Sequence, residues 1–417
     1  MPAFGGVRGT GDWGPDERPK HFREGILWLN PNGTAPIFAL TSKTGKGQSV
    51  NDPETSWWAE PNDLVRLQTS VARSNAANQT TITVDSGDPT DATGFSGNNT
   101  HYGSARNLAV DDLLMVEPGS DSANFNPEVL RVTSITSPTV FEVARGAAGT
   151  NRAAIPDNSF LLKIGNAHAE GTRSPASHSR NPIKYYNYTQ IFKNTYEVTG
   201  TAMETNARTG DPVKNDKMRA MFDHARDMEL ALLYGHRNED ADGGTNGKPR
   251  RTMGGLREFI PNTVLANNST IQAFLDAVSP VFDWDSQAGD TRLAFCGNGA
   301  LNNLNKKLIA AEANGVVRIN YDATESMYGV KFTKFRVPQG DLMIKTHPLL
   351  SRHPLYTNSM YIVDMSMLKV KPLKNRDTKF KDNIQHNDED TKKGQWQTEC
   401  TLMVDGGGRT MKYIGNI

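Results

Sequence analysis

The chain is poor in cysteine and in long hydrophobic runs. Cys296 and Cys400 are the only cysteines among 417 residues, they lie far apart, and no CxxC spacing occurs. Neither a disulfide framework nor a thiolate zinc site is therefore expected, and a reducing cytosol is the natural compartment. The N-terminal region lacks the apolar stretch of a signal peptide, and no run approaches the roughly 18 apolar residues that a membrane span needs. We expect no membrane partner.

Net charge and hydrophobic residues are also scarce. The 46 Lys and Arg residues balance 46 Asp and Glu residues, which argues against a dedicated nucleic-acid binder and against a polybasic membrane protein. The hydrophobic fraction of 36% is low for a compact globule, whereas 37 Gly and 22 Pro residues indicate much loop and β structure. Such a chain must expose much polar surface or complete its core with partner chains.

Recognisable catalytic and cofactor-binding patterns are missing as well. The sequence holds no GxSxG, no HExxH around His224 and no cysteine with a matching histidine. The KTGKG segment at 43–47 lacks the spacing of a phosphate-binding loop, and the group Asp85, Asp88 and Asp91 lacks the spacing of an EF-hand. We therefore predict no catalytic residue, no cofactor and no metal site.

The strongest positive signal is an amphipathic helix over residues 211–235. Asp211 is placed to cap the first N–H groups, Pro212 suits the first turn, and Gly235 is placed for a left-handed residue after the last turn. His224 is interpreted as a packing or surface histidine. Apolar residues at three- and four-residue steps predict one buried face. Its expected core residues are Met218, Met221, Phe222, Ala225 and Leu232.

The region before this helix is expected to be extended. Residues 1–56 are rich in Gly, Pro and Asn with scattered apolar side chains, which predicts an N-terminal arm rather than a domain. From 57 to 200 short alternating strands follow, with a small all-β module at about 76–166.

Aromatic and basic side chains occur in the arm and on both sides of the β module. Because the chain is neutral, these residues favour a contact between subunits over single-stranded nucleic-acid binding. The candidate contact residues are Phe22, Trp28, Trp57, Trp58, Arg173, Arg180, Tyr185, Tyr188 and Phe192.

Helices and strands alternate after the long helix. A helix is expected over 268–284, a buried strand over 291–297 and another helix directly after it, a pattern typical of an α/β domain. The chain ends in two strands of period two, at 397–406 and 410–415.

Two segments carry a resemblance to a known family. They read TVFEVARGAAGTNRAAIPDNSFLLKIGNAHAEG at 139–171 and NYTQIFKNTYEVTGTA at 187–202. Together with the order of arm, β excursion, long helix and α/β domain, they resemble the major capsid proteins of tailed bacteriophages that have the Hong Kong 97-like fold. The resemblance is to the subfamily with a β-rich insertion in the excursion, which is called the E-loop.

The resemblance implies an α+β fold with four parts: an N-terminal arm (1–56), an E-loop (57–200), a peripheral domain (201–262 and 365–417) and an axial domain (263–364). It also implies a structural protein, not an enzyme, that self-assembles into hexamers and pentamers of an icosahedral head around double-stranded DNA. The expected location is the virion, after assembly in the host cytoplasm. Expected partners are other copies of the chain, DNA through non-specific contacts, and portal, scaffolding and decoration proteins.

Three alternatives remain open from the sequence. A tail or baseplate protein can also carry an inserted β module, and the shell of a cellular nanocompartment shares the fold. An enzyme of another class, a hydrolase using Asp or Glu within 111–142, would require a concave site with perturbed carboxylates.

Overall fold

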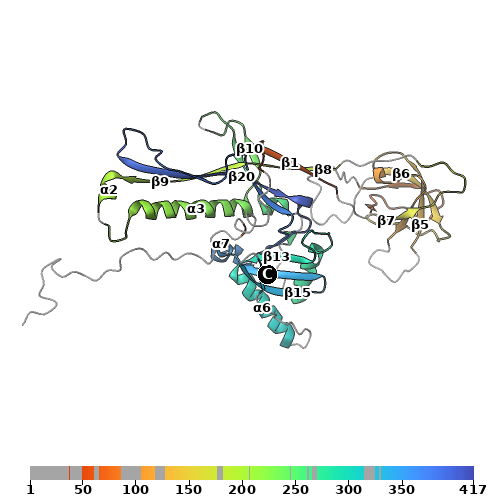
Figure 1. Ribbon diagram of the computed structural model, residues 1–417. Helices are drawn as coiled ribbons and strands as arrows, with labels where there is room; N and C mark the ends of the chain where they lie inside the picture. Colours follow the sequence, from red (N-terminus) through yellow and green to blue (C-terminus); the bar gives the residue numbers. More distant parts are fainter. Residues whose placement is uncertain are drawn as a thin grey trace, which may run out of the picture.

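The molecule is elongated. The computed structural model describes residues 37, 49–60, 65–85, 105–117, 127–175, 182–205, 207–244, 246–260, 263–264, 270–313, 325–327 and 330–417. In Figure 1 a long helix and two long strands lie on one side, a small β module lies on the other, and an α/β domain with the C-terminus lies below them.

The long helix α3 spans Pro212–Tyr234, close to its predicted bounds. The Asp211 carboxylate accepts hydrogen bonds from two N–H groups of the first turn and so caps the helix. Gly235 follows the last turn, but its φ of −55° is not left-handed, so that part of the prediction is wrong. Glycine is needed there for space, because a Cβ would lie 2.3 Å from the carbonyl oxygen of Met253.

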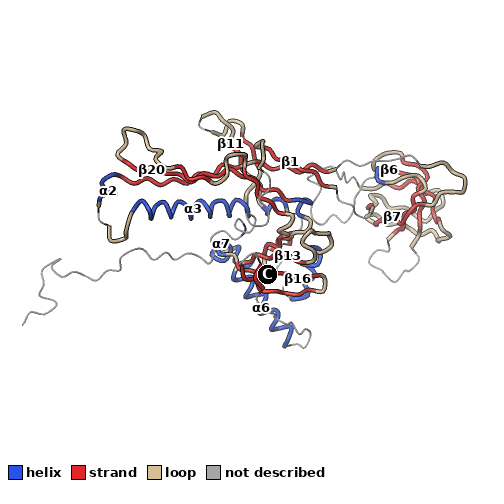
Figure 2. Tube along the Cα trace, viewed as in Figure 1, coloured by secondary structure: helices blue, strands red, loops and turns tan. Residues whose placement is uncertain are grey.

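Helix α3 lies along a twisted antiparallel sheet, and we call the helix and this sheet the spine unit (Figure 2). Strand β9 pairs with β20 from Gln190 opposite Cys400 to Thr199 opposite Thr391. Strands β18 and β19 pair with further stretches of β20. The elements of the sheet, with the short helix that leads from β9 toward α3, are β9 (Gln190–Thr199), β18 (Leu368–Pro372), β19 (Lys379–Lys381), β20 (Thr391–Val404) and α2 (Gly200–Glu204).

The buried face of α3 differs from the predicted one. Its buried residues are Ala220, His224, Met228, Glu229, Leu232 and Leu233. Of the predicted core residues, Leu232 is buried, while Met218, Phe222 and Ala225 are half-buried. Met221 is 41% exposed, so its placement in the core is wrong. At ~100° per residue, the face on the sheet lies roughly 100° around the helix from the predicted stripe.

A buried histidine accounts for this rotation. His224 Nδ1 lies 2.8 Å from Asn194 Oδ1 on β9, and His224 Nε2 lies 2.7 Å from Thr398 Oγ1 on β20. Ala220 packs beside it against Tyr196 and Val198. The polar side chains of helix and sheet satisfy one another, so a face with few apolar residues is the one that packs on the sheet.

A two-stranded ribbon, β1 (Glu54–Ala59) with β8 (Ile183–Tyr188), connects the spine unit to the β module. The module contains β2 (Arg66–Gln68), β3 (Thr81–Thr83), β4 (Asp112–Val116), β5 (Val129–Ile135), β6 (Val140–Ala147) and β7 (Phe160–Asn166), with a turn η1 (Ala105–Asn107). Their order in the sheet is β2-β7-β4-β5-β6-β3.

The module is a closed barrel. Its first and last strands meet through Thr69 opposite Val84, with hydrogen bonds from Ser70 N to Thr83 O (3.0 Å) and from Asp85 N to Gln68 O (2.9 Å). Because β2 completes the ring, the module begins before the predicted residue 76. A closed barrel has no free strand edge, so it stays apart from neighbouring sheets.

The α/β domain is built on a seven-stranded mixed sheet in the order β12-β21-β17-β13-β16-β15-β14. Its strands are β12 (Thr263–Val264), β13 (Thr291–Cys296), β14 (Glu325–Met327), β15 (Val330–Val337), β16 (Gly340–Thr346), β17 (Met360–Val363) and β21 (Lys412–Ile414). Its helices are α5 (Ile271–Val278), α6 (Asn298–Ala313) and α7 (Pro348–Arg352), with turns η2 (Ser279–Val281) and η3 (Tyr356–Asn358). The predicted helix over 268–284 is thus shorter, ending in a 3₁₀ turn that contains Pro280.

The C-terminal strand corrects one predicted boundary. Strand β21 pairs with β12 in parallel and with β17 antiparallel, so the chain end belongs to the α/β sheet and not to the peripheral part. Met411, Tyr413 and Ile414 are buried there, which explains the placement. Between α3 and this domain lie β10 (Asn238–Asp240), β11 (Arg250–Thr252) and α4 (Leu256–Phe259), and η4 (Asp405–Gly408) precedes β21. Among the described residues no helix is both long and apolar enough to cross a membrane.

The rotated face gives a test by substitution. Met228 is 3% exposed and Met221 is 41% exposed, on the same helix. Met228→Asp places an unpaired charge in the core and should lower the free energy of unfolding by about 3 kcal/mol or more. Met221→Asp should change the free energy of unfolding by less than about 1 kcal/mol. Urea unfolding followed by tryptophan fluorescence measures both, and equal losses would contradict the observed face.

Candidate assembly surfaces

Four of the nine predicted contact residues lie on the connecting ribbon, and a fifth, Phe192, lies on the adjoining strand β9. They differ in burial. Trp57 and Phe192 are each 6% exposed, so their assignment as contacts between subunits is wrong. Trp57 Nε1 donates to the carbonyl oxygen of Val404 at 3.0 Å, and the Trp57 ring stacks on Tyr185 with centroids 6.2 Å apart. These side chains fasten the ribbon to the core of its own chain, because inward residues alternate with outward ones along each strand.

The outward face of the ribbon is aromatic and basic. Trp58, opposite Lys184, is 62% exposed. Tyr186 lies beside it on the same face, with the Arg237 guanidinium 4.1 Å from its ring centroid. Tyr188 meets Tyr186 edge-on at 5.7 Å. A large exposed aromatic side chain such as Trp58 is a typical anchor of a protein interface.

The remaining candidates divide as follows. Arg173 is exposed in the segment that leaves the barrel. Phe22, Trp28 and Arg180 lie outside the described residues, as do the KTGKG segment and Asp88 and Asp91. Trp58, Tyr188 and Arg173 are thus the candidates that the described surface offers to a partner.

The NYTQIF segment forms the base of the ribbon. Asn187 is fully buried, and its amide nitrogen donates to the carbonyl oxygens of Gly254 (3.0 Å) and Leu402 (2.8 Å). Its amide oxygen accepts from the N–H groups of Gly254 and Tyr188. Thr189 Oγ1 donates to the Glu399 carboxylate at 3.0 Å. The NYTQIF motif therefore joins the ribbon, the spine unit and the 253–255 turn through buried polar side chains. The sequence alone did not predict this structural role.

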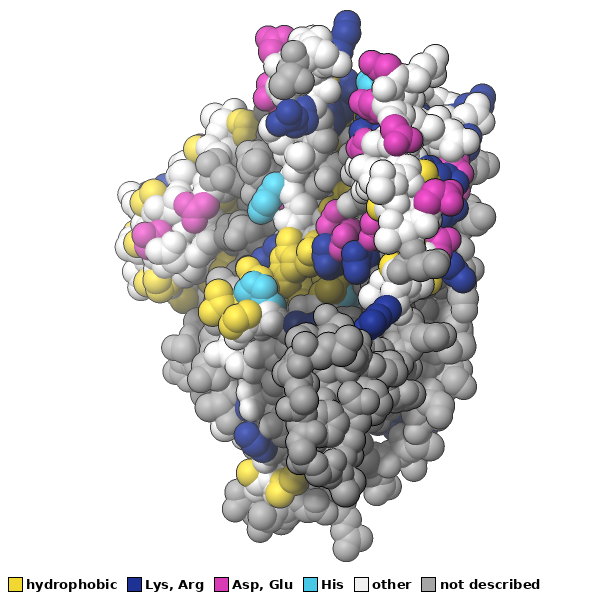
Figure 3. Space-filling view, turned by 90° about the vertical axis from the view of Figure 1, so that its left-hand side faces the viewer, with side chains coloured by type: hydrophobic (Ala, Val, Ile, Leu, Met, Phe, Trp, Pro, Cys, Tyr) yellow, Lys and Arg dark blue, Asp and Glu magenta, His cyan; other side chains and the backbone are white. Residues whose placement is uncertain are grey.

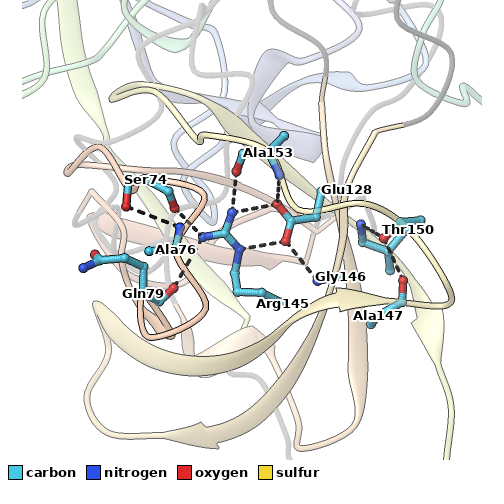
Figure 4. Close-up of polar contacts among 10 residues, drawn as sticks. Ser74, Ala76, Gln79, Glu128, Arg145, Gly146, Ala147, Thr150 and Ala153 are labelled. Atoms are coloured by element: carbon cyan, nitrogen blue, oxygen red, sulfur yellow. Dashed lines mark hydrogen bonds and ion pairs between the residues drawn. The ribbon is translucent and has the colours of Figure 1, made fainter.

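The RGAAGT segment at 145–150 lies next to a buried ion pair in the barrel, between Arg145 and Glu128 (Figure 4). The Arg145 guanidinium makes two hydrogen bonds of 2.7 Å to the Glu128 carboxylate, and the two side chains are 2% and 0% exposed. Arg145 also donates to the carbonyl oxygens of Ser74, Gln79 and Ala153. Arg145 thus bonds to three segments of the barrel: the loop that contains Ser74 and Gln79, the loop that contains Ala153, and Glu128 before β5.

The neighbouring residues complete this arrangement. The N–H groups of Gly146 and Ala153 donate to Glu128 at 3.0 Å each. Gly146 has a φ of +65°, which favours glycine, and a Cβ there would lie 2.9 Å from the Thr150 carbonyl oxygen. Thr150 Oγ1 donates to Ala147 O and accepts from Val129 N. The segment that carried the family resemblance is therefore a fixed turn around a buried ion pair.

A second buried carboxylate lies at the junction of α3 with the α/β domain. His347 Nδ1 accepts the N–H of Leu349, so its Nε2 carries the hydrogen and donates to Glu229 Oε1 at 2.8 Å. The same oxygen accepts the N–H of Ile37 at 2.9 Å. Glu229, His347 and Ile37 are all fully buried. The junction holds three segments that are far apart in the sequence, and no sequence motif marks it.

Two buried thiols and a buried histidine are further titratable groups of the described core. Cys296 and Cys400 are buried, and burial raises the pKa of each thiol to about 12. Burial lowers the pKa of His224, which keeps the imidazole neutral between helix and sheet. In the part of the chain that the structure describes, no group of three His, Cys, Asp or Glu side chains is placed to hold a metal ion.

Comparison with known proteins places the chain among the shell proteins of viruses. Its sequence matches the family described as SU10 major capsid protein over residues 7–409. The curated "Major capsid protein" of Pseudomonas phage PaMx41 is 27% identical over 391 residues, which cover 91% of this chain and 84% of that protein. The class is thus a bacteriophage major capsid protein, a structural component of the virion that associates with copies of itself, and not an enzyme. The chain belongs to the SU10 major capsid protein family.

Two solved phage structures align with 95% or more of this chain at low sequence identity. The capsid of Myoviridae phage XM1 is 9% identical with a TM-score of 0.43, covering 99% of this chain and 100% of that chain. The structure of Microbacterium phage Oxtober96 is 11% identical with a TM-score of 0.41, covering 95% of each chain. The described elements are mixed α and β with strands predominating, and β excursion, long helix and α/β domain follow in the order expected of the Hong Kong 97-like fold.

The ion pair in the barrel can be tested by removing its cation. Arg145→Met leaves the Glu128 carboxylate buried without its countercharge, with only the N–H groups of Gly146 and Ala153 as donors, which should cost about 3–5 kcal/mol. Limited proteolysis on heating should then cut within 65–166 at a lower temperature than in the wild type. Arg131→Met is the control, because the Arg131 side chain is 47% exposed and its ion pair with Asp111 is long, at 3.9 Å. This substitution should change the free energy of unfolding by less than about 0.5 kcal/mol. Equal proteolysis of the two variants would contradict the structural role.

The same pair predicts a pH dependence. Burial raises the pKa of Glu128, but hydrogen bonds from Arg145 and from the Ala153 and Gly146 N–H groups outweigh it and lower the pKa below 4.5. Because this pKa is lower in the folded state, the contribution to stability is present above the pKa of the unfolded chain and is lost as pH falls through the folded value. The barrel should therefore become protease-sensitive as pH falls below 4.5 and through the lowered pKa of Glu128. The Arg145→Met variant should show a weaker pH dependence in the same assay.

Proposed function

We propose that this capsid protein forms the hexamers and pentamers of an icosahedral phage head that encloses double-stranded DNA. The family match over residues 7–409 is the observation that carries the proposal. The proposed subunit has four parts: an N-terminal arm (1–56), an E-loop (57–200), a peripheral domain (201–262 and 365–408) and an axial domain (263–364). The last of these also takes in residues 409–417, because β21 pairs within its sheet.

The ribbon and barrel support a role as the excursion that reaches a neighbouring subunit. Within one chain the barrel is joined to the spine unit through the two strands β1 and β8 (Figure 1). Two-stranded ribbons are at best marginally stable alone in water. Contact of the outward face, with Trp58 and Tyr188, against another copy would fix the ribbon and bury its exposed aromatic surface.

The mixed charge of the surface supports contacts of moderate strength between copies of the chain. On the face that Figure 3 shows, acidic and basic side chains are interspersed above and to the right of a central group of hydrophobic ones. Mixed charges favour specific pairing between copies, and a neutral chain holds DNA only by weak, non-specific contacts. Portal, scaffolding and decoration proteins are further proposed partners, and the host cytoplasm is the proposed site of assembly.

Electron microscopy of the purified protein tests the proposal. Closed shells support it, particularly if their absorbance shows packaged nucleic acid after infection. Tubes or flat rings would favour a tail component, and shells that hold only protein would favour a nanocompartment. A compact monomer in size-exclusion chromatography, even with assembly factors co-expressed, would contradict self-assembly.

The two adjacent tryptophans provide a matched pair of variants. Trp58→Ala removes a side chain that is 62% exposed, so the fold should lose less than about 1 kcal/mol while shell yield falls severalfold. Trp57→Ala removes a core side chain that is 6% exposed and should cost about 3–5 kcal/mol of stability. Thermal unfolding and particle counts measure the two effects. Normal assembly of the Trp58→Ala variant would show that this face is not a contact between subunits.

A further inference from the structure

The sheet of the spine unit has two faces, and α3 lies along one of them (Figure 2). Asn194 on β9 and Thr398 on β20 face the helix, because both contact His224. Phe380 on β19 faces it as well, since the Lys217 ammonium of α3 lies 3.7 Å from its ring centroid. Side chains alternate along a strand, so the residues next to these point to the opposite side.

We call this opposite side the outer sheet face. Directly paired residues of neighbouring strands lie on the same face, so the pairing of β20 with β9, β18 and β19 defines its members. They are the odd-numbered residues 191–197 of β9, 393–403 of β20, 379 and 381 of β19, and 369 and 371 of β18.

The outer sheet face is basic, although the whole chain is neutral. Residues 369–381 hold six Lys and Arg residues and one Asp. The carboxylates on this side are matched by ion pairs: Asp405 with Lys369, Glu399 with Arg376, and Glu197 with Lys393. Four lysines of the face remain that form no ion pair with a carboxylate of the described chain, namely Lys193, Lys371, Lys379 and Lys381.

Three of these lysines lie close together. Gln397 pairs with Lys193 on one side and with Lys379 on the other. Neighbouring strands are about 4.8 Å apart, so the Cα atoms of Lys193 and Lys379 are about 10 Å apart, and Lys381 lies about 7 Å farther along β19. All three side chains are exposed, and Lys371 on β18 is half-buried. Positive charges that a sheet holds at this spacing attract a polyanion.

The chemistry of the face favours phosphate over protein. Protein interfaces are depleted of Lys and enriched in aromatic side chains, Met and Arg. The outer sheet face has mainly Lys, Gln, Thr and Glu side chains, with Ile191 and Met403 as its apolar members, whereas the outward face of the ribbon carries Trp58. A lysine ammonium contacts a phosphate as a point charge and reads no base.

We propose that the outer sheet face binds the phosphate backbone of double-stranded DNA, without sequence preference, through Lys193, Lys371, Lys379 and Lys381. This inference rests on the proposed function, in which the shell encloses DNA, and it names the surface of the subunit that meets the DNA. That surface then faces the interior of the shell.

DNA binding by the full-length chain in solution tests the site. The variant Lys379→Gln with Lys381→Gln removes two charges from the face, and Lys214→Gln with Lys248→Gln removes two exposed charges elsewhere, on α3 and in the β10–β11 loop. Fluorescence anisotropy of a labelled duplex of about 30 base pairs, from about 50 to 200 mM NaCl, gives the slope of log K against log salt. The first variant should bind severalfold more weakly at low salt, with a slope less steep by about 1.8, and the second should match the wild type.

The structure also defines the results that would overturn the inference. Equal slopes and affinities in the two variants would show that DNA does not use this face, and binding that differs between duplex sequences would exclude a contact with phosphate alone. Tighter binding of poly-L-glutamate than of the duplex would show that an acidic protein segment is the partner. Since the assay needs no assembly, normal shells together with unchanged DNA binding by the first variant refute this inference alone, whereas a wild-type chain that never assembles refutes the proposed function.

Discussion

The packing of α3 on the β9–β20 pair is the constraint on which the other parts depend. Strand β9 ends the excursion and β20 lies near the C-terminus, so the pair joins segments about 200 residues apart. His224 reaches both strands from the helix and fixes their order. The ribbon continues directly into β9, and therefore the direction of the excursion is set by this contact.

Buried polar side chains, more than apolar ones, define how the units meet. Asn187 joins the ribbon, the 253–255 turn and β20, and Glu229 joins α3, the α/β domain and Ile37. Arg145 and Glu128 join loops within the barrel. Each of these side chains bonds to backbone groups or to another buried side chain. A hydrophobic contact tolerates sliding, but a buried polar group that loses its partner is costly. The junctions are thus held in one geometry, which a subunit that repeats many times requires.

This use of polar residues also explains what the sequence predicted and what it did not. The ends of α3 follow from local capping chemistry at Asp211 and from the apolar periodicity, and both were predictable. Which side of the helix is buried depends on partners from β9 and β20, so periodicity selected Met221, whereas the structure buries His224. Adjacent Trp57 and Trp58 read alike in sequence, but the pairing of β1 with β8 sends them to opposite faces. Closure of the barrel depends on Thr69 meeting Val84, a non-local pair that no local signal marks.

The low hydrophobic fraction of the chain agrees with a core that is divided into several parts. A hydrophobic fraction of 36% is too low for one large core, and the described chain has several smaller ones, in the barrel, in the α/β sheet and around α3. Small cores joined by a thin ribbon leave the relative position of barrel and spine unit weakly determined within one chain. If neighbouring copies cover the outward face of the ribbon, as we propose, each contact would both order the ribbon and bury Trp58. A substitution on that face would then reduce assembly before it reduced the stability of the single subunit.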